Sequence, residues 1–203
     1  MKSFSEIDVT SKRASRGVGF SWGVAEEIGK SVRSLELFGL PGIKTLNQYY
    51  NLKIKERFEN LNLIKENNLS EKYPYCPIHL GINFLDQIKN IEKFKKITFN
   101  KLSFPLLILP FLSKSSEVIG KKIKVKFNNF EFLLNFNMNI SSNLVDQKLP
   151  ETVENLEINI IENKDNFSEQ EWKSLYKLSE EIFVDETDSL KQGAAGAGLT
   201  DND

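Results

Sequence analysis

The stretch Ile123–Met138, IKVKFNNFEFLLNFNM, has a period of two and decides the class of fold. Apolar residues take alternate positions on both sides of its centre: Ile123, Val125 and Phe127 before it, then Phe130, Phe132, Leu134, Phe136 and Met138 after it. Alternate residues of a strand share one face, so each half presents an apolar face. Asn128 and Asn129 accept the positive φ angles that a two-residue turn requires. We therefore expect a β-hairpin with one buried face.

The sequence after the hairpin predicts one more strand and a helix. Leu156, Ile158 and Ile160 alternate with polar residues, which indicates a strand. Ser168 and Glu171 have the spacing of a capping box, which opens a helix. One side of this helix is mainly apolar: Trp172, Leu175, Tyr176, Ser179, Ile182 and Phe183. We expect that side to pack on the sheet.

The N-terminal sequence predicts a helix from about Phe4 to Arg16. Ser3 and Glu6 have the capping-box spacing, so the helix should begin directly after Ser3. Gly17 and Gly19 interrupt the helical pattern, and we expect them to end the helix.

A second and a third helix are expected to follow. Ser21 can cap the second helix, whose apolar residues repeat at helical spacing: Val24, Ile28, Val32 and Leu35. Gly39 and Pro41 should end it, and a short third helix should begin near Gly42. Three apolar residues lie on one side of that third helix: Ile43, Leu46 and Tyr50.

Two segments have no clear period. Residues 51–75 are polar and their apolar residues are loosely spaced, and we expect a helix there. Phe104–Leu112, FPLLILPFL, is the most hydrophobic segment, and it contains two prolines. It is about half of the roughly 20 residues that span a bilayer. We expect it to be a buried strand or loop.

The order of helices, strands and a final helix indicates an α+β domain with a mainly antiparallel sheet. A chain of 203 residues is long enough for one core and does not require two. We expect a single domain over residues 1–192. Residues 193–203 form a glycine-rich tail, which we expect to fold back on that domain.

Charge and cysteine content indicate a cytoplasmic protein without a nucleic-acid or membrane partner. The net charge of -1 provides no overall field that would attract nucleic acid or an anionic membrane. The most basic run, Lys89–Lys101, is interrupted by Glu92 and is interpreted as a solvated lysine face. Cys76 is the only cysteine, and the N-terminal MKSFSEID lacks the apolar stretch of a signal peptide.

The segment Arg13–Glu27, RASRGVGFSWGVAEE, holds the densest group of candidate binding residues. Arg13 and Arg16 stand three residues apart, so both leave the same helix face and could grip one carboxylate or phosphate. Trp22 offers a flat wall beside them. Three glycines allow close approach of the backbone: Gly17, Gly19 and Gly23. This arrangement predicts a site for a small anion.

Two carboxylates in the same segment are the candidate catalytic residues. Glu26 and Glu27 could accept a proton, and burial of the pair together would raise the pKa of one of them. The alternative is that they pair with Arg13 and Arg16 while Trp22 fills the core.

Cys76 and His79 form a second candidate group. A thiolate beside an imidazole is the essential element of thiol nucleophilic catalysis. Pro77 lies between them, and two such residues are too few for a metal site. The favoured interpretation is a buried cysteine and a surface histidine.

The tail offers oxygen ligands but no phosphate loop. It lacks the preceding strand and the following helix of such a loop. Thr200, Asp201 and Asp203 could contribute to a Mg²⁺ or Ca²⁺ site, or could supply the anion for Arg13 and Arg16. The sequence defines neither a cofactor nor a metal.

Two segments together resemble one family. Arg13–Gly42 resembles the N-terminal R-x-x-R-G-x-G-x-x-W-G-x-A-E-E…G-L-P-G signature of an uncharacterised, mainly proteobacterial domain family, and GAAGAGLTDND at 193–203 resembles that family's ending. CPIHLG and PLLILPF match less strongly, and FVDETDSLKQ departs from the family's Y-V-P-x-S-x-x-S-R. The family has no assigned activity. The resemblance implies that the tail is a recurring element.

Two functions follow from these residues, and the sequence leaves enzymatic activity undecided. The first is a metabolic enzyme or accessory protein that binds a small anionic ligand between the Arg13, Arg16 and Trp22 segment and the tail. The second is a non-catalytic subunit of a homo- or hetero-oligomer whose tail docks into a partner. A structural domain without a ligand is a third alternative.

Overall fold

The computed structural model describes residues 2–53, 57–135, 139–144 and 148–182. The chain divides into two compact units, Met1–Asn163 and Lys164–Asp203, and each is described by itself. The predicted domain boundaries at 192 and 193 lie outside the described residues and stay a prediction.

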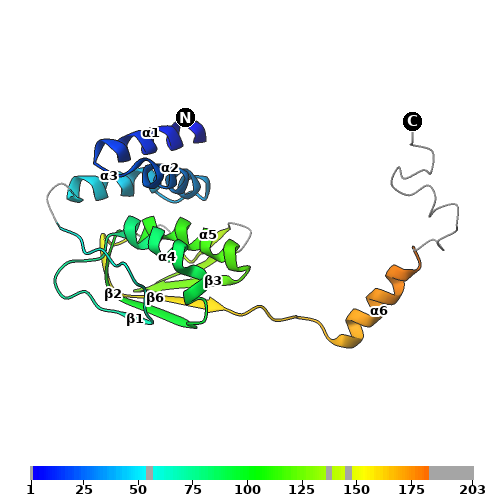
Figure 1. Ribbon diagram of the computed structural model, residues 1–203. Helices are drawn as coiled ribbons and strands as arrows, with labels where there is room; N and C mark the ends of the chain where they lie inside the picture. The colour runs from blue at the N-terminus through cyan, green and yellow to red at the C-terminus, as the bar shows by residue number, and fades with distance from the viewer. Residues whose placement is uncertain (1, 54–56, 136–138, 145–147, 183–203) are drawn as a thin grey trace, which may run out of the picture. The chain divides into compact units, whose positions relative to one another are not determined.

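The first unit has two layers of helices above a sheet (Figure 1). One layer contains the three N-terminal helices: α1 (Phe4–Gly17), α2 (Trp22–Leu37) and α3 (Gly42–Lys53). The second layer contains α4 (Pro77–Ile91), the short 3-10 helix η1 (Pro105–Ile108) and α5 (Leu109–Ile119). The second layer separates α1–α3 from the sheet. No helix among the described residues is long and apolar enough to cross a membrane.

The caps and glycines place the first three helices where the sequence predicts them. Ser3 and Glu6 form a capping box in which each side chain accepts a hydrogen bond from the backbone of the other. The Ser21 side chain accepts the amide of Val24 at the start of α2. Gly19 has a φ of 94°, a conformation that favours glycine and ends the helical path after α1.

The sheet has six strands in the order β1-β2-β6-β3-β4-β5. Their bounds are β1 Asn67–Asn68, β2 Lys96–Ser103, β3 Lys122–Phe127, β4 Phe130–Leu134, β5 Ile140–Ser142 and β6 Thr152–Ile161. Only β1 and β2 pair in parallel, while the other neighbours are antiparallel. The α+β class and the mainly antiparallel sheet are therefore confirmed.

The predicted hairpin forms between β3 and β4, with Val125 opposite Phe132. Its turn differs from the expectation, because Asn128 has a positive φ of 49° and Asn129 does not. The described strand ends at Leu134, and the expected continuation through Phe136 and Met138 lies outside the described residues.

The apolar face of the sheet shifts by one residue along β2 and β6. Phe99 and Leu156 are opposite each other and buried, and the next buried pair is Leu102 and Val153. Asn155, between the two pairs, has a φ of 66°, which turns the strand so that the same face stays covered. Strict alternation along β6 therefore extends only over its second half.

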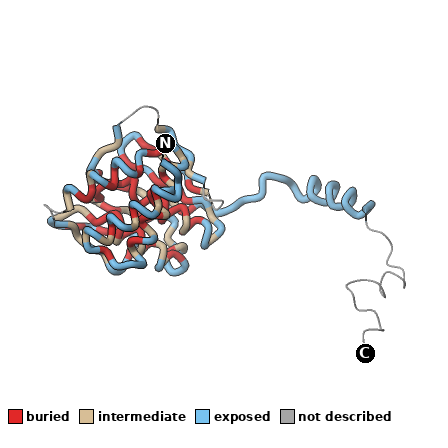
Figure 2. The backbone as a smooth tube through the Cα atoms, turned by 90° about the horizontal axis from the view of Figure 1, so that it is seen from above, coloured by how far each residue is buried: buried red, intermediate tan, exposed pale blue. Residues whose placement is uncertain are grey.

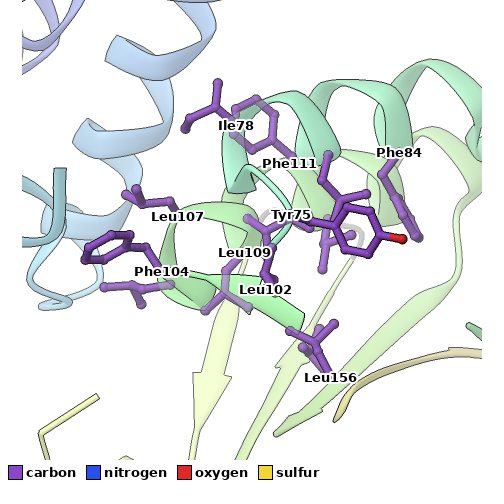
Figure 3. Close-up of a cluster of buried hydrophobic side chains, with 14 of the residues drawn as sticks. Tyr75, Ile78, Phe84, Leu102, Phe104, Leu107, Leu109, Phe111 and Leu156 are labelled. Carbon is purple, nitrogen blue, oxygen red and sulfur yellow. The ribbon is translucent and has the colours of Figure 1, made fainter. Parts of the chain in front are cut away.

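The core lies between the sheet and the second helical layer (Figure 3). Side chains from α4, α5 and the sheet meet there, including Phe84, Phe111, Leu102 and Leu156. The two helices approach closely at Gly81, where an added β-carbon would lie 2.5 Å from the Phe111 ring. Glycine at this position is therefore a packing requirement.

The expected helix over residues 51–75 is wrong. Helix α3 ends at Lys53, and residues 57–75 are an extended loop with the two-residue strand β1. Side chains of α4 hold the loop: Asn83 donates to the Leu61 carbonyl, and Gln87 donates to that of Asn62. These tertiary contacts replace the backbone bonds of a helix.

The expected strand or loop at Phe104–Leu112 is also wrong in conformation, although its burial is confirmed. The segment is helical from Pro105, first as η1 and then as α5. Both prolines stand in the first turn of a helix, where the missing amide hydrogen costs no helical bond. Two prolines in a short apolar run thus mark two successive helix starts.

The second unit contains α6 (Glu169–Glu180). Ser168 and Glu171 form the predicted capping box. Phe167 stacks on Trp172 with ring centroids 5.6 Å apart, and every described residue of this unit is exposed (Figure 2). Packing of α6 on the sheet stays a prediction.

Replacing Gly29 tests the contact between α1 and α2. A β-carbon at Gly29 would lie 2.7 Å from the Asp8 carbonyl oxygen, so Gly29→Ala must push the helices apart. We expect a loss of about 1–3 kcal/mol in the free energy of unfolding, measured by urea denaturation. Gly23→Ala in the same helix meets nothing within 4 Å and serves as the control. Equal stability of the two variants would contradict the close contact.

Candidate functional site

The turn between α1 and α2 presents an arginine stacked on a tryptophan. The guanidinium carbon of Arg16 lies 4.7 Å from the centroid of the Trp22 ring. Nη1 of Arg16 also donates a hydrogen bond to the Phe20 carbonyl, which fixes the side chain across the turn. Trp22 is 62% exposed, so the expectation that it fills the core is wrong. A flat aromatic and cationic surface therefore faces solvent here.

Three glycines near this surface have no neighbouring atoms where a side chain would begin. Gly17, Gly19 and Gly23 each have nothing within 4 Å of the position that a β-carbon would take. None of them is needed for close packing inside the unit. Only Gly19 requires glycine for its φ of 94°. The other two are exposed and leave space beside the backbone.

Arg13 and Arg16 do not pair with the neighbouring glutamates. Arg13 is exposed and Arg16 is half-buried, and within the described ranges neither forms an ion pair. The Nε atom of Arg16 is buried and has no hydrogen-bond partner there. The alternative interpretation, in which the arginines pair with Glu26 and Glu27, is therefore wrong.

Both glutamates form ion pairs with lysines instead. Glu26 contacts Lys30 at 3.1 Å and Lys12 at 3.8 Å. Glu27 contacts Lys30 at 3.2 Å and also pairs with Lys114 of α5. The Glu27–Lys114 pair joins the N-terminal helical layer to the second one. These carboxylates therefore hold helices in position.

The pKa values of both glutamates move in the opposite direction to the one expected for a catalytic pair. A hydrogen bond from Lys30 is the main cause that lowers the pKa of Glu26. Burial raises the pKa of Glu27, but Lys114 and Lys30 outweigh it and the net shift is downward. Both groups are ionised at neutral pH. Proton transfer by either stays a prediction, without a raised pKa to support it.

The Cys76 and His79 segment lies directly behind the turn. Phe20 packs against His79 and Tyr50, with ring centroids 5.7 Å and 6.3 Å away. Lys53 closes the cluster, because its Nζ donates to the Val18 carbonyl at 3.3 Å and lies 4.2 Å above the Phe20 ring. The fold thus brings together two groups that are far apart in sequence.

Cys76 is a buried thiol. It is 2% exposed, and its Sγ is 3.0 Å from the Tyr49 hydroxyl. Burial raises the pKa of the Cys76 thiol and lowers the pKa of His79, so both groups favour their neutral forms. The buried cysteine is confirmed, whereas His79 is half-buried rather than fully at the surface.

Sequence reasoning missed two polar groups in this cluster. Ser15 donates to the Ser11 carbonyl and forms a 2.5 Å hydrogen bond with the Tyr50 hydroxyl. Burial raises the pKa of Tyr50 to about 12. The spacing of Ser11 and Ser15, one helical turn apart in α1, was the available signal. The hydrogen bond between Ser15 and Tyr50 connects α1 to α3.

The other predicted ligands lie beyond the described part of the chain. Thr200, Asp201 and Asp203 fall in 183–203, so their expected approach to the arginines stays a prediction. Among the described residues, no three His, Cys, Asp or Glu side chains are grouped to hold a metal ion.

Comparison with known proteins gives one family match. The model of a family described as a protein of unknown function, DUF3726, matches residues 2–75. A DUF3726 domain therefore covers α1–α3 and the loop after them. The match includes Arg13–Gly42, on which the resemblance rests, but not the tail. No curated protein and no solved structure matches the chain.

The burial of Cys76 in this cluster predicts that its thiol reacts slowly with thiol reagents in the native protein. We expect its reaction with the thiol reagent DTNB at pH 8 to be at least about 100-fold slower in the native protein than in guanidinium. A raised pKa lowers the thiolate fraction at that pH, and burial blocks access. Since Cys76 is the only cysteine, the absorbance change reports it alone. Rapid native reaction would restore the thiol–imidazole hypothesis.

The Glu27–Lys114 pair predicts a pH-dependent coupling between the two helical layers. A double-mutant cycle with Glu27→Gln and Lys114→Gln should give a coupling of about 1 kcal/mol at pH 7 in urea unfolding. The pKa of Glu27 is lowered from 4.5, so this stabilisation is present above 4.5 and is lost as the pH falls through the lowered value. Equal coupling at pH 7 and pH 3 would contradict the ion pair. Glu26→Gln, which removes more exposed pairs, should have a smaller effect.

Proposed function

We propose that the DUF3726 domain is a binding module for a small anionic ligand, held at the surface formed by Arg13, Arg16 and Trp22. One observation carries the proposal. Arg16 stacks on the exposed Trp22, Arg13 is exposed one helical turn earlier in α1, and neither arginine has a carboxylate partner in the described ranges. Cations and an aromatic face left open in this way suit an anionic group with a flat or polar body.

The start of α2 adds to the attraction for an anion. The first turn of α2 contains no acidic residue, and the Ser21 side chain accepts a hydrogen bond from only one of its amides, that of Val24. The first amides of a helix and its dipole both favour negative charge. Arg16 adds positive charge near this helix start, because its guanidinium stacks on Trp22 in the first turn while Nη1 is bonded to the Phe20 carbonyl.

Binding is favoured over catalysis for this protein. Cys76 is buried in its neutral form, and Glu26 and Glu27 are occupied by lysines. We place the protein in the cytoplasm, where its single cysteine would stay reduced. In this proposal Thr200, Asp201 and Asp203 of the tail close over the ligand.

A second candidate is the non-catalytic subunit. Helix α6 supports it, because Trp172, Leu175 and Tyr176 are exposed along one side of a helix too short to be stable in isolation. A protein partner or another copy would then cover that side. This candidate predicts no response of the Trp22 surface to small anions.

Trp22 fluorescence tests the anion site directly. The chain has two tryptophans, so Trp172→Phe leaves Trp22 as the only reporter. Because Arg16 stacks on Trp22, an anion that engages Arg16 should change the emission, and we expect saturable titrations with phosphate or citrate. Arg13→Gln and Arg16→Gln should each weaken binding about tenfold or more.

The controls separate this surface from general attraction to positive charge. Arg57→Gln, at an exposed arginine in the loop after α3, should leave the affinity within about twofold. A chain ending at Gln192 should bind more weakly if the tail closes over the ligand. An emission that does not respond, or responds equally in all variants, would reject the site.

A further inference from the structure

A second candidate site lies between α2 and α5, inside the first unit. Lys30 and Arg33 of α2 and Lys114 of α5 line a hollow of about 220 Å³. This hollow is near the end of α2, whereas Trp22 is at its beginning. Two elements from different helical layers therefore place three cationic side chains around one space.

Acidic side chains outside the hollow orient these cations. Arg33 Nη1 lies 3.4 Å from Asp8 of α1, while Lys30 and Lys114 both contact Glu27. A guanidinium has five N–H donors, and the Asp8 contact involves only the Nη1 group. Asp8 therefore occupies only the Nη1 group of Arg33, and the other N–H groups of the guanidinium can donate to a second anion.

Two serines add hydroxyl groups to the same lining. Ser31 and Ser34 line the hollow with the cations. Ser31 is 4% exposed, and its Oγ has no hydrogen-bond partner among the described residues. A buried hydroxyl without a partner costs free energy that a ligand oxygen would recover after a small side-chain adjustment.

The remaining lining is apolar. Leu37 and Phe38 at the end of α2 and Pro110 at the start of α5 complete the hollow. The lining of the hollow therefore combines cationic with apolar side chains. Its volume of about 220 Å³ is below the roughly 300 Å³ at which pockets for drug-sized ligands begin, so a small ligand fits it best.

We propose that this hollow binds a small organic anion, with a carboxylate or phosphate at Arg33 and Lys114 and a short apolar body against Leu37, Phe38 and Pro110. Charge-assisted hydrogen bonds would orient the head, and burial of the apolar body would add affinity. The site is independent of the surface formed by Arg13, Arg16 and Trp22.

Amide chemical shifts of the full-length protein test the proposal. We would titrate the ¹⁵N-labelled chain with benzoate, phenyl phosphate and inorganic phosphate. Saturable shifts are expected at the amides of Ser31–Phe38 and of Lys114. Phenyl phosphate should bind at least about fivefold more tightly than inorganic phosphate, because only phenyl phosphate buries an apolar body.

Three variants make the test specific. Arg33→Gln, on an exposed side chain, should preserve the spectrum of the fold and weaken binding about tenfold or more. Ser34→Phe should fill the hollow and abolish the shifts. Arg57→Gln, at an exposed arginine outside both candidate sites, is the matched control and should change the affinity by less than about twofold.

Several results would overturn the site. Absence of shifts at about 10 mM ligand would do so, since even weak small-molecule binding is visible there. Equal shifts in the parent, Arg33→Gln and Ser34→Phe proteins would show attraction to surface lysines only. Loss of binding in Arg13→Gln with none in Arg33→Gln would assign the anion to the Trp22 surface instead.

Discussion

Close contact of α2 with its two neighbours is the constraint on which the rest of the helical layer depends. At Gly29 a β-carbon would meet the backbone of α1, and at Gly42 it would lie 2.9 Å from Leu35 of α2. Three helices can share this layer only because those two positions lack side chains. Both candidate binding regions include residues of α2, one at its first turn beside α1 and one toward its end beside α5. Their geometry therefore follows from the packing of one helix.

The polar groups of this layer divide into those that hold the fold and those that face solvent. Glu27 and Lys114 connect two helical layers, and Ser15 and Tyr50 connect α1 to α3. Arg16 connects the end of α1 to the following turn through the Phe20 carbonyl and lies on the ring of the exposed Trp22. Within the described ranges it forms no ion pair, so its charge is not neutralised by a carboxylate of the fold. This contrast supports binding over catalysis in the DUF3726 domain.

Local signals predicted much of the fold, and non-local contacts explain the errors. Capping boxes at Ser3 and Ser168 define helix starts, because the bonds involved span only three residues. The loop 57–75 has no such local sequence signal, because hydrogen bonds from side chains of α4 hold it in place. Pro105 gave a misleading signal, because proline breaks a helix from within but suits its first turn.

The sequence by itself determined the three N-terminal helices, the α+β class and the apolar face of the β3–β4 hairpin, because those depend on periodicity and on caps within one turn. Only the tertiary structure decided which side chains became partners. Glu27 meets Lys114 across 87 residues, and Cys76 meets Tyr49 across 27. Such pairs depend on how helices approach each other in space. Spacing along the chain places a residue on a face, but packing decides what that face meets.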